Sequence, residues 1–118
     1  MNPEFQVTVD EIGTTTVLRL SGNVDRSAGP AVEAAYQKTG NARHLVLDFG
    51  AASYINSSGI ALVVSVLARA RSEGRRVAAF GLSEHYREIF EITRLSDFIE
   101  ICPDLESAVA NAAPAGNG

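Results

Sequence analysis

Cysteine, basic charge and long apolar runs are all scarce in this sequence of 118 residues, and each scarcity excludes a class of protein. The one cysteine, Cys102, cannot form a disulfide within the chain, so we expect a cytoplasmic protein. Cys102 lies in the apolar run 98–102, where a packed thiol is favoured over a nucleophile. Neither a signal segment nor a run of 18 apolar residues occurs, so the sequence predicts no membrane insertion.

Acidic residues outnumber basic ones by 14 to 10, which gives a formal net charge of -4. The clustered arginines, at positions 69, 71, 75 and 76, surround one predicted helix end, where cations favour the helix dipole. Because no lysine-rich face exists, the sequence predicts no binding of nucleic acid. Asp25, Asp48 and the two histidines lack the spacing of metal ligands, and no glycine-rich phosphate loop is present, so we expect no metal or other cofactor.

Apolar residues make up 46% of the chain and charged residues 20%, which is enough apolar side chain for the core of one domain. The predicted strands span about 5–9, 14–20, 43–49, 76–80 and 98–102, and the predicted helices about 27–39, 57–73, 83–94 and 104–112. This ββαβαβαβα order favours a single compact α/β domain over residues 1–112, with a mixed, mostly parallel sheet of about five strands packed by about four helices. Residues 21–25 are predicted as a loop and 113–118 as a flexible tail.

The most informative segment joins the central strand to the second helix and reads Asn56-Ser57-Ser58-Gly59. A helix N-terminus has unpaired N–H groups and a partial positive charge, so a serine there can be a cap, a nucleophile or a phosphate site. On a helical wheel Ser58 heads a polar stripe toward solvent, whereas Ser57 leans toward the packed side and Val64 faces the sheet. The wheel predicts Ser58 as the accessible hydroxyl, with Leu62 beside it as an incidental or a partner-facing apolar side chain.

A serine hydrolase is the first alternative to a phosphate site. Ser57 and Ser58 lack the first glycine of a Gly-x-Ser-x-Gly motif, and His44 and His85 are predicted as surface residues rather than as a catalytic base. Asparagine and serine are also common N-cap residues, so capping alone can account for the segment. We therefore expect no enzymatic activity, and the residues by themselves leave a cap and a modification site open.

Three stretches, in the right order, resemble the STAS domain family of bacterial anti-sigma factor antagonists. The stretch 18–25, Leu-Arg-Leu-Ser-Gly-Asn-Val-Asp, is similar to a family segment after the second strand. Residues 45–49 (Leu-Val-Leu-Asp-Phe) and 54–60 (Tyr-Ile-Asn-Ser-Ser-Gly-Ile) are similar to the family core, which is the most specific of the three. Residues 90–95, 98–99 and 105–109 resemble the C-terminal end, so the resemblance covers residues from about 5 to 112.

The resemblance implies a mechanism in which partners are exchanged. A serine in the position of Ser58 is phosphorylated by an anti-sigma factor that doubles as a GHKL-type serine kinase, and a PP2C-type phosphatase restores the unmodified state. The unmodified domain binds that kinase and releases a sigma factor, and the position of Asp25 helps to contact the kinase. The resemblance thus implies an anti-sigma factor antagonist with Ser58 as the phosphorylation site and Ser57 as second choice. The implied partner surface consists of Asp25, Asn56, Ser57, Ser58, Gly59 and Leu62.

The sequence departs from the family at Asn56, where the family usually has aspartate. Asparagine keeps the capping oxygen but loses the charge, which can change kinase recognition and removes repulsion against a nearby phosphate. Some STAS members act as scaffolds or as subunits beside a lipid transporter, without such a switch. Because Ser58 is retained, the phosphorylation switch is the first hypothesis, and a scaffold or transporter-associated role is the alternative.

Overall fold

The computed structural model describes residues 4–112, and for residues 111 and 112 it describes the backbone alone. The predicted tail, 113–118, lies outside the described residues. The strands are β1 (Gln6–Ile12), β2 (Thr15–Val24), β3 (His44–Ile55), β4 (Arg76–Phe80) and β5 (Glu100–Cys102). The helices are α1 (Gly29–Lys38), α2 (Ser57–Ser72), α3 (Glu84–Ile92) and α4 (Leu105–Ala112), with short 3-10 turns η1 (Arg26–Ala28) and η2 (Leu95–Asp97). The predicted order ββαβαβαβα is confirmed.

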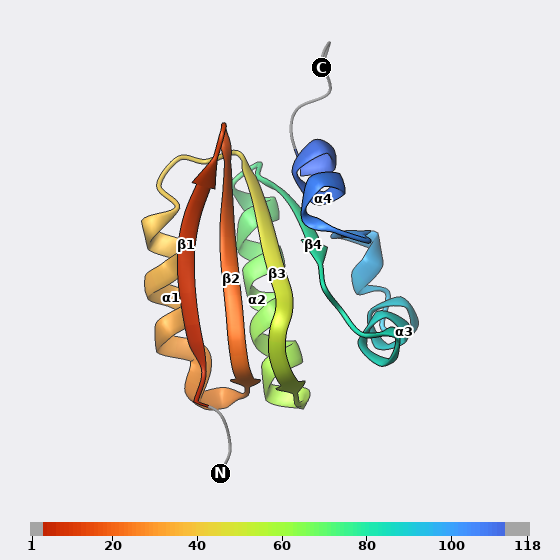
Figure 1. Cartoon of the computed structure of the whole chain (residues 1–118). Coiled ribbons are helices and arrows are strands. Elements are labelled where there is room, and N and C mark those ends of the chain that lie inside the picture. The colour runs from red at the N-terminus through yellow and green to blue at the C-terminus, as the bar shows by residue number, and fades with distance from the viewer. Residues whose placement is uncertain (1–3, 113–118) are drawn as a thin grey trace.

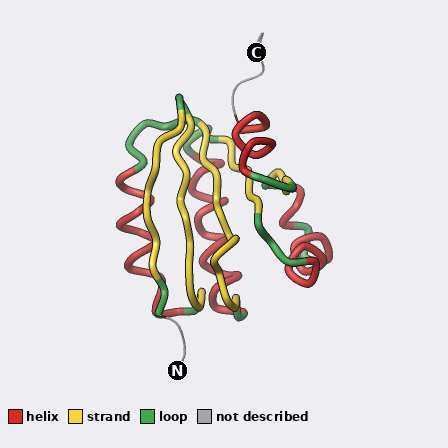
Figure 2. Tube along the Cα trace, in the orientation of Figure 1, coloured by secondary structure: helices red, strands yellow, loops and turns green. Residues whose placement is uncertain are grey.

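The strands form one mixed sheet in the order β1-β2-β3-β4-β5, so β3 is central (Figure 1). β1 pairs antiparallel with β2 at one edge, and the other neighbours pair in parallel, as predicted. Side chains alternate along a strand, so Leu45 and Leu47 lie on one face of β3 and Val46 on the other. The first face is covered by α1, α2 and α3, and the second by α4. Figure 2 shows α1 and α2 running along the strands.

β2 and β3 extend further than predicted, which corrects the predicted loop at 21–25. β2 continues to Val24 and pairs with β3 as far as Ile55. The Gly-Asn pair at 22–23 has the composition of a turn, but Gly22 takes φ 81 beside a register shift inside the ladder. A Cβ on Gly22 would lie 2.2 Å from the Glu4 carbonyl oxygen. The glycine is therefore needed for the close approach of the residues before β1, and it does not form a turn. The two strands therefore end side by side at Val24 and Ile55.

The C-terminal third needs two corrections. α3 ends at Ile92 rather than at residue 94, so Thr93 lies beyond the helix and is exposed, whereas Phe90 within the helix is fully buried. The last strand begins at Glu100 rather than at Phe98, which is exposed before it. Cys102 is buried, in agreement with the predicted packed thiol.

His44, predicted at the surface, is 8% exposed at the start of β3. Its Nδ1 is, within residues 4–112, the buried side-chain polar atom that lacks a hydrogen-bond partner. Burial lowers the pKa of His44 below its usual range, and the positive charges of Arg76 and Arg43 act in the same direction. Folding therefore favours the neutral imidazole over the charged one.

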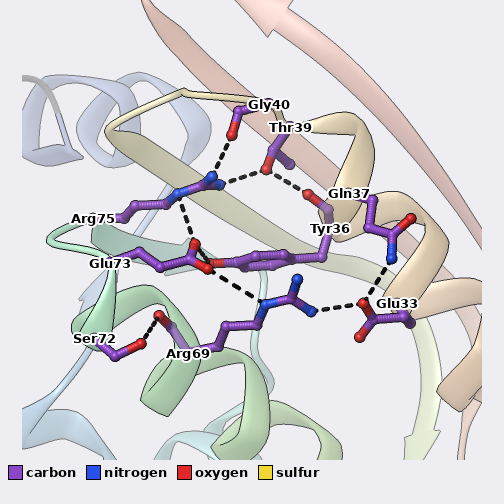
Figure 3. Close-up of polar contacts among 9 residues, drawn as sticks. All are labelled: Glu33, Tyr36, Gln37, Thr39, Gly40, Arg69, Ser72, Glu73 and Arg75. Atoms are coloured by element: carbon purple, nitrogen blue, oxygen red, sulfur yellow. Dashed lines mark hydrogen bonds and ion pairs between the residues drawn. The ribbon is translucent and has the colours of Figure 1, made fainter.

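A polar network joins α1 to the C-terminal end of α2 (Figure 3). The ring of Tyr36 lies between the guanidinium groups of Arg69 and Arg75, at 4.4 and 5.0 Å from the ring centroid. Its hydroxyl donates a 2.7 Å hydrogen bond to Glu73, which also pairs with both arginines. Burial, together with this hydrogen bond, raises the pKa of Tyr36 to about 12. Glu33 accepts a 2.7 Å hydrogen bond from Arg69, so charged groups on both helices hold α2 against α1.

Candidate functional site

The serine segment follows the end of β3 and begins α2. Asn56 is the N-cap of α2, and its Oδ1 accepts a 2.8 Å hydrogen bond from the Gly59 N–H, which confirms the predicted cap. One residue earlier, the Ile55 N–H donates to the Tyr86 hydroxyl of α3 at 2.9 Å. Tyr86 thus helps to fix the segment, and the sequence pattern did not single it out because this contact joins residues 31 positions apart.

Gly59 allows the end of β2 to approach the first turn of α2. A Cβ at this position would lie 2.0 Å from the Val24 carbonyl oxygen, so only glycine fits. The same carbonyl accepts a 3.3 Å hydrogen bond from the Asn56 N–H. Val24 and Ile55 are register partners, so Asp25 and Asn56 leave the sheet on adjacent strands. Gly59 itself is buried, and it supports the surface rather than forming it.

Asp25 caps the short turn η1 that follows β2. Its Oδ1 accepts a 2.9 Å hydrogen bond from the Ser27 N–H and a second one from the Ser27 hydroxyl. Asp25 is therefore the N-cap of η1. Because η1 packs against α2, the structure brings Asp25 to the same end of the sheet as the serine segment.

The exposure of the two hydroxyl residues is the reverse of the helical-wheel prediction. Ser57 is exposed and Ser58 is half-buried. Neither side chain hydrogen-bonds to another described residue, and Ser58 Oγ is not one of the fully buried polar atoms of that part of the chain, so solvent reaches it. The helical-wheel prediction assumed that only the sheet buries one side of α2, whereas η1 also packs against this helix. Ser58 keeps an accessible oxygen, but Ser57 is the more accessible of the two.

The whole of α2 is rotated from its predicted orientation. Val64, predicted to face the sheet, is 42% exposed, and Leu62, predicted beside the solvent stripe, is half-buried between α1 and α2. At about 100° per residue, the exposed arc is centred roughly 80° from the predicted one. Arg69 lies in the predicted polar stripe, but it pairs with Glu33 of α1, so its side of the helix faces α1 while Ser65 and Ser72 stay exposed. The exposed arc consists of Ser57, Ala61, Val64, Ser65, Ala68, Arg71 and Ser72.

The first turn of α2 has donors for an anion. The Gly59 N–H is taken by the Asn56 side chain, and the Ile60 N–H bonds to the Asn56 carbonyl at 2.9 Å. The N–H groups of Ser57 and Ser58 precede these, where a helix supplies no partners of its own. Together with the partial positive charge of the helix terminus, they favour a negatively charged group on either serine.

Among the described residues, no hydrogen bond joins a histidine to either serine. His44 begins β3, and Ile55 ends it eleven residues further on, so the imidazole lies about 36 Å from the serine end of that strand. His85 is exposed on α3, where its ring contacts that of Tyr86 at 5.0 Å between centroids. Over residues 4–112, no three His, Cys, Asp or Glu side chains gather as metal ligands. In the same part of the chain, no helix is long and apolar enough to cross a membrane.

Fold and site together define a small α/β binding domain with a serine-bearing helix N-terminus beside the ends of two central strands. The family model described as "Mlab, STAS domain" matches residues 7–103. The chain therefore belongs to the STAS domain family, which confirms the resemblance seen in the sequence.

Relatives and solved structures agree with this assignment. BtrV of Bordetella bronchiseptica, a candidate anti-sigma factor antagonist, is 34% identical over 111 residues, which are 92% of this chain and 93% of that protein. An anti-sigma factor antagonist from Mycobacterium paratuberculosis has a TM-score of 0.80 at 20% identity, covering 92% of this chain and 94% of that one. The phosphorylated form of the Bacillus cell fate determinant SpoIIAA has a TM-score of 0.68 at 22% identity, covering 93% of this chain and 100% of that one. At these identities the two structures establish the fold alone.

Proposed function

We propose that this protein is an anti-sigma factor antagonist that binds an anti-sigma factor and is switched off by phosphorylation in the first turn of α2. Ser58 is the proposed phosphorylation site, and Ser57 is the second choice. The proposed kinase is the anti-sigma factor itself, of the GHKL type, and a PP2C-type phosphatase is the proposed opposing enzyme. Support comes from membership of the STAS family, from BtrV, and from SpoIIAA, which is known in a phosphorylated form.

The observation that carries the proposal is the position of Ser58, whose side chain lies in the first turn of α2 without a hydrogen bond to another described residue. A phosphate there adds about -1.5 to -2 charges. The helix terminus stabilises that anion by about 0.3–2 kcal/mol, so the modified domain stays folded. At an interface the same charge must lose water or meet like charge, which costs several kcal/mol. The interface effect is the larger one, so phosphorylation separates the partners without unfolding the domain.

The proposed partner surface surrounds Ser58 at the end of the sheet. Asp25 and Asn56 leave adjacent strands, and the exposed Ser57 lies between Asn56 and Ser58 in the chain. Gly59 and Leu62 contribute from beneath, because the first admits the β2 carbonyl and the second packs between α1 and α2. Asn56 is neutral, so it does not repel a phosphate on the neighbouring serines.

The test is incubation of the full chain with each GHKL-type serine kinase of its source organism and ATP, followed by intact mass and site mapping. We expect one phosphate on Ser58, its absence in Ser58→Ala, and its removal by a PP2C-type phosphatase. In calorimetry Ser58→Asp should weaken kinase binding by about a thousandfold, or about 4 kcal/mol, with little change in Tm. Asn41→Asp adds the same charge before β3, at the far end of that strand, and should keep the affinity. Modification of Ser57 alone would move the site, and unchanged affinity of Ser58→Asp would contradict the switch.

A further inference from the structure

An exposed apolar groove lies between α2 and η2, on the arc of α2 that the helical wheel had assigned to the sheet. We call it the α2–η2 groove, and its volume is about 210 Å3. Val64 and Phe98 line it from opposite sides, at 42% and 50% exposure. Two large apolar side chains that face one hollow form a surface that an apolar segment of another protein can cover. The groove is lined by Val64, Leu67, Ala68, Arg71, Leu95 and Phe98.

The charge around this groove favours an acidic occupant. Arg71 stacks on Phe98, with 4.9 Å from the guanidinium carbon to the ring centroid, and forms no ion pair within residues 4–112. Phe98 and Arg71 also line an adjoining hollow of about 290 Å3, where Arg76 likewise has no ion-pair partner among the described residues. Two acidic residues line that hollow. Asp97 pairs with Arg94, so Glu100 is the carboxylate there that has no ion-pair partner among the described residues. Two unpaired guanidinium groups against one unpaired carboxylate complement a negatively charged ligand.

The groove lies on the exposed arc of α2 that begins at Ser57, the residue next to the proposed phosphorylation site. Ser57, Ala61, Val64 and Ala68 share the exposed arc of α2. With a rise of 1.5 Å per residue, Val64 lies about 9 Å from Ser58 along the helix axis. A stable interface buries about 800 Å2 on each partner, so a protein that covers Ser58 also reaches Val64. The two alanines leave room for the backbone of such a partner to approach the helix.

We propose that the α2–η2 groove receives an amphipathic, acidic segment of the same partner that phosphorylation of Ser58 releases. Apolar side chains of that segment cover Val64 and Phe98, and a carboxylate pairs with the planar guanidinium of Arg71. This inference rests on the proposed function. It gives the partner a second contact that is distinct from the serine turn and separately testable.

The first measurement uses the kinase that modifies Ser58 in the mapping experiment. In calorimetry, Val64→Asp and Arg71→Glu should each weaken its binding at least tenfold. Ile12→Asp, the same change at an exposed apolar residue of the edge strand β1, is the matched control and should bind as the unaltered protein does. Thermal unfolding of all three variants checks that each folds.

The second measurement does not need the kinase. A synthetic helical peptide with leucines three and four residues apart and glutamates elsewhere is titrated into the labelled protein, and amide chemical shifts are followed. We expect shifts at the groove residues, their loss in Arg71→Glu, and their retention in Ser58→Asp. The same peptide with lysines in place of glutamates should not bind.

The outcomes test the proposed role of the groove separately from the proposed phosphorylation switch. Unchanged kinase affinity in both groove variants overturns the proposal even where Ser58 is phosphorylated. Equal binding of the lysine peptide, or shifts elsewhere on the protein, overturns the charge argument. If sedimentation shows a dimer that Val64→Asp dissociates, the groove binds a second copy of this chain, and the proposal of an acidic partner segment is overturned as well. Where no kinase modifies Ser58, the switch fails and the peptide titration alone decides the groove.

Discussion

Gly59→Ala is the sharpest test of how the serine segment is held. The added Cβ would lie 2.0 Å from the Val24 carbonyl oxygen, 2.8 Å from the carbonyl carbon and 3.0 Å from Ile55 Cγ2. Real Cβ atoms essentially never come within 3.0 Å of a neighbour, so β2 or α2 must move by about 1 Å. The obstacle is backbone, and the overpacking cost of about 1–3 kcal/mol exceeds the 0.5–1 kcal/mol, roughly, by which alanine is favoured over glycine in a helix.

Gly29→Ala, at the start of α1, is the matched control for this prediction. Its nearest atom would be Leu62 Cδ2 at 3.6 Å, an ordinary contact. Urea unfolding should place Gly59→Ala about 1–3 kcal/mol below the unaltered protein and Gly29→Ala at or above it by up to about 1 kcal/mol. The same shift should slow phosphorylation of Ser58 in the first variant and leave it unchanged in the second. Equal stability of the two alanine variants would refute the close approach of β2 to α2.

Three further predictions concern the cap and two buried titratable groups. Asn56→Ala leaves the Gly59 N–H without its acceptor and should cost about 1 kcal/mol in urea unfolding, whereas a loss also seen in Asn56→Asp would show that the cap is not the cause. The pKa of His44 is lowered in the folded chain, so as the pH falls the unfolded chain takes up the proton at a higher pH than the folded chain does. The free energy of unfolding should therefore be at its full value above about pH 6.5 and decrease below it. In pH-dependent unfolding, His44→Leu should lack this decrease. Because the pKa of Tyr36 is raised to about 12, the free energy of unfolding should be at its full value below about pH 10 and decrease as the pH rises from there toward about 12. Tyr36→Phe should lack this decrease. Tyrosinate absorbance of the folded protein that titrates as in the unfolded chain would contradict the raised pKa.

Local pattern was sufficient for the order of the elements and for the helix cap. β4 spans the predicted residues, and Asn56 caps α2, because apolar period and capping chemistry are properties of neighbouring residues. The end of β2 could not be predicted in this way. Gly22 and Asn23 have turn composition, but their conformation is set by pairing with β3 and by the chain that crosses at Glu4. Such contacts leave no trace in the segment itself.

The orientation of α2 illustrates a second limit. Arg69 and the serines of the helix define a polar stripe, and a single helix in isolation would turn that stripe to water. In the fold, Arg69 instead reaches Glu33, 36 residues away, and Val64 is left exposed. The helix therefore has two apolar sides, one packed on the sheet and one in the α2–η2 groove. A periodicity argument cannot distinguish them, because both carry the same residue types.

The attachment of α2 at both ends supports the proposed switch, in which a charge acts at the surface of the helix without moving it. At the N-terminal end, the Asn56 cap and the packing of Gly59 on β2 fix the first turn. At the C-terminal end, the buried Tyr36 and its charged neighbours tie the helix to α1. Between them, the burial of Val63 and Leu67 stabilises the packed face by about 1.5–3 kcal/mol for each side chain. A phosphate interacts with the helix terminus by at most about 2 kcal/mol, so it cannot displace α2, and its main effect falls on whatever is bound there.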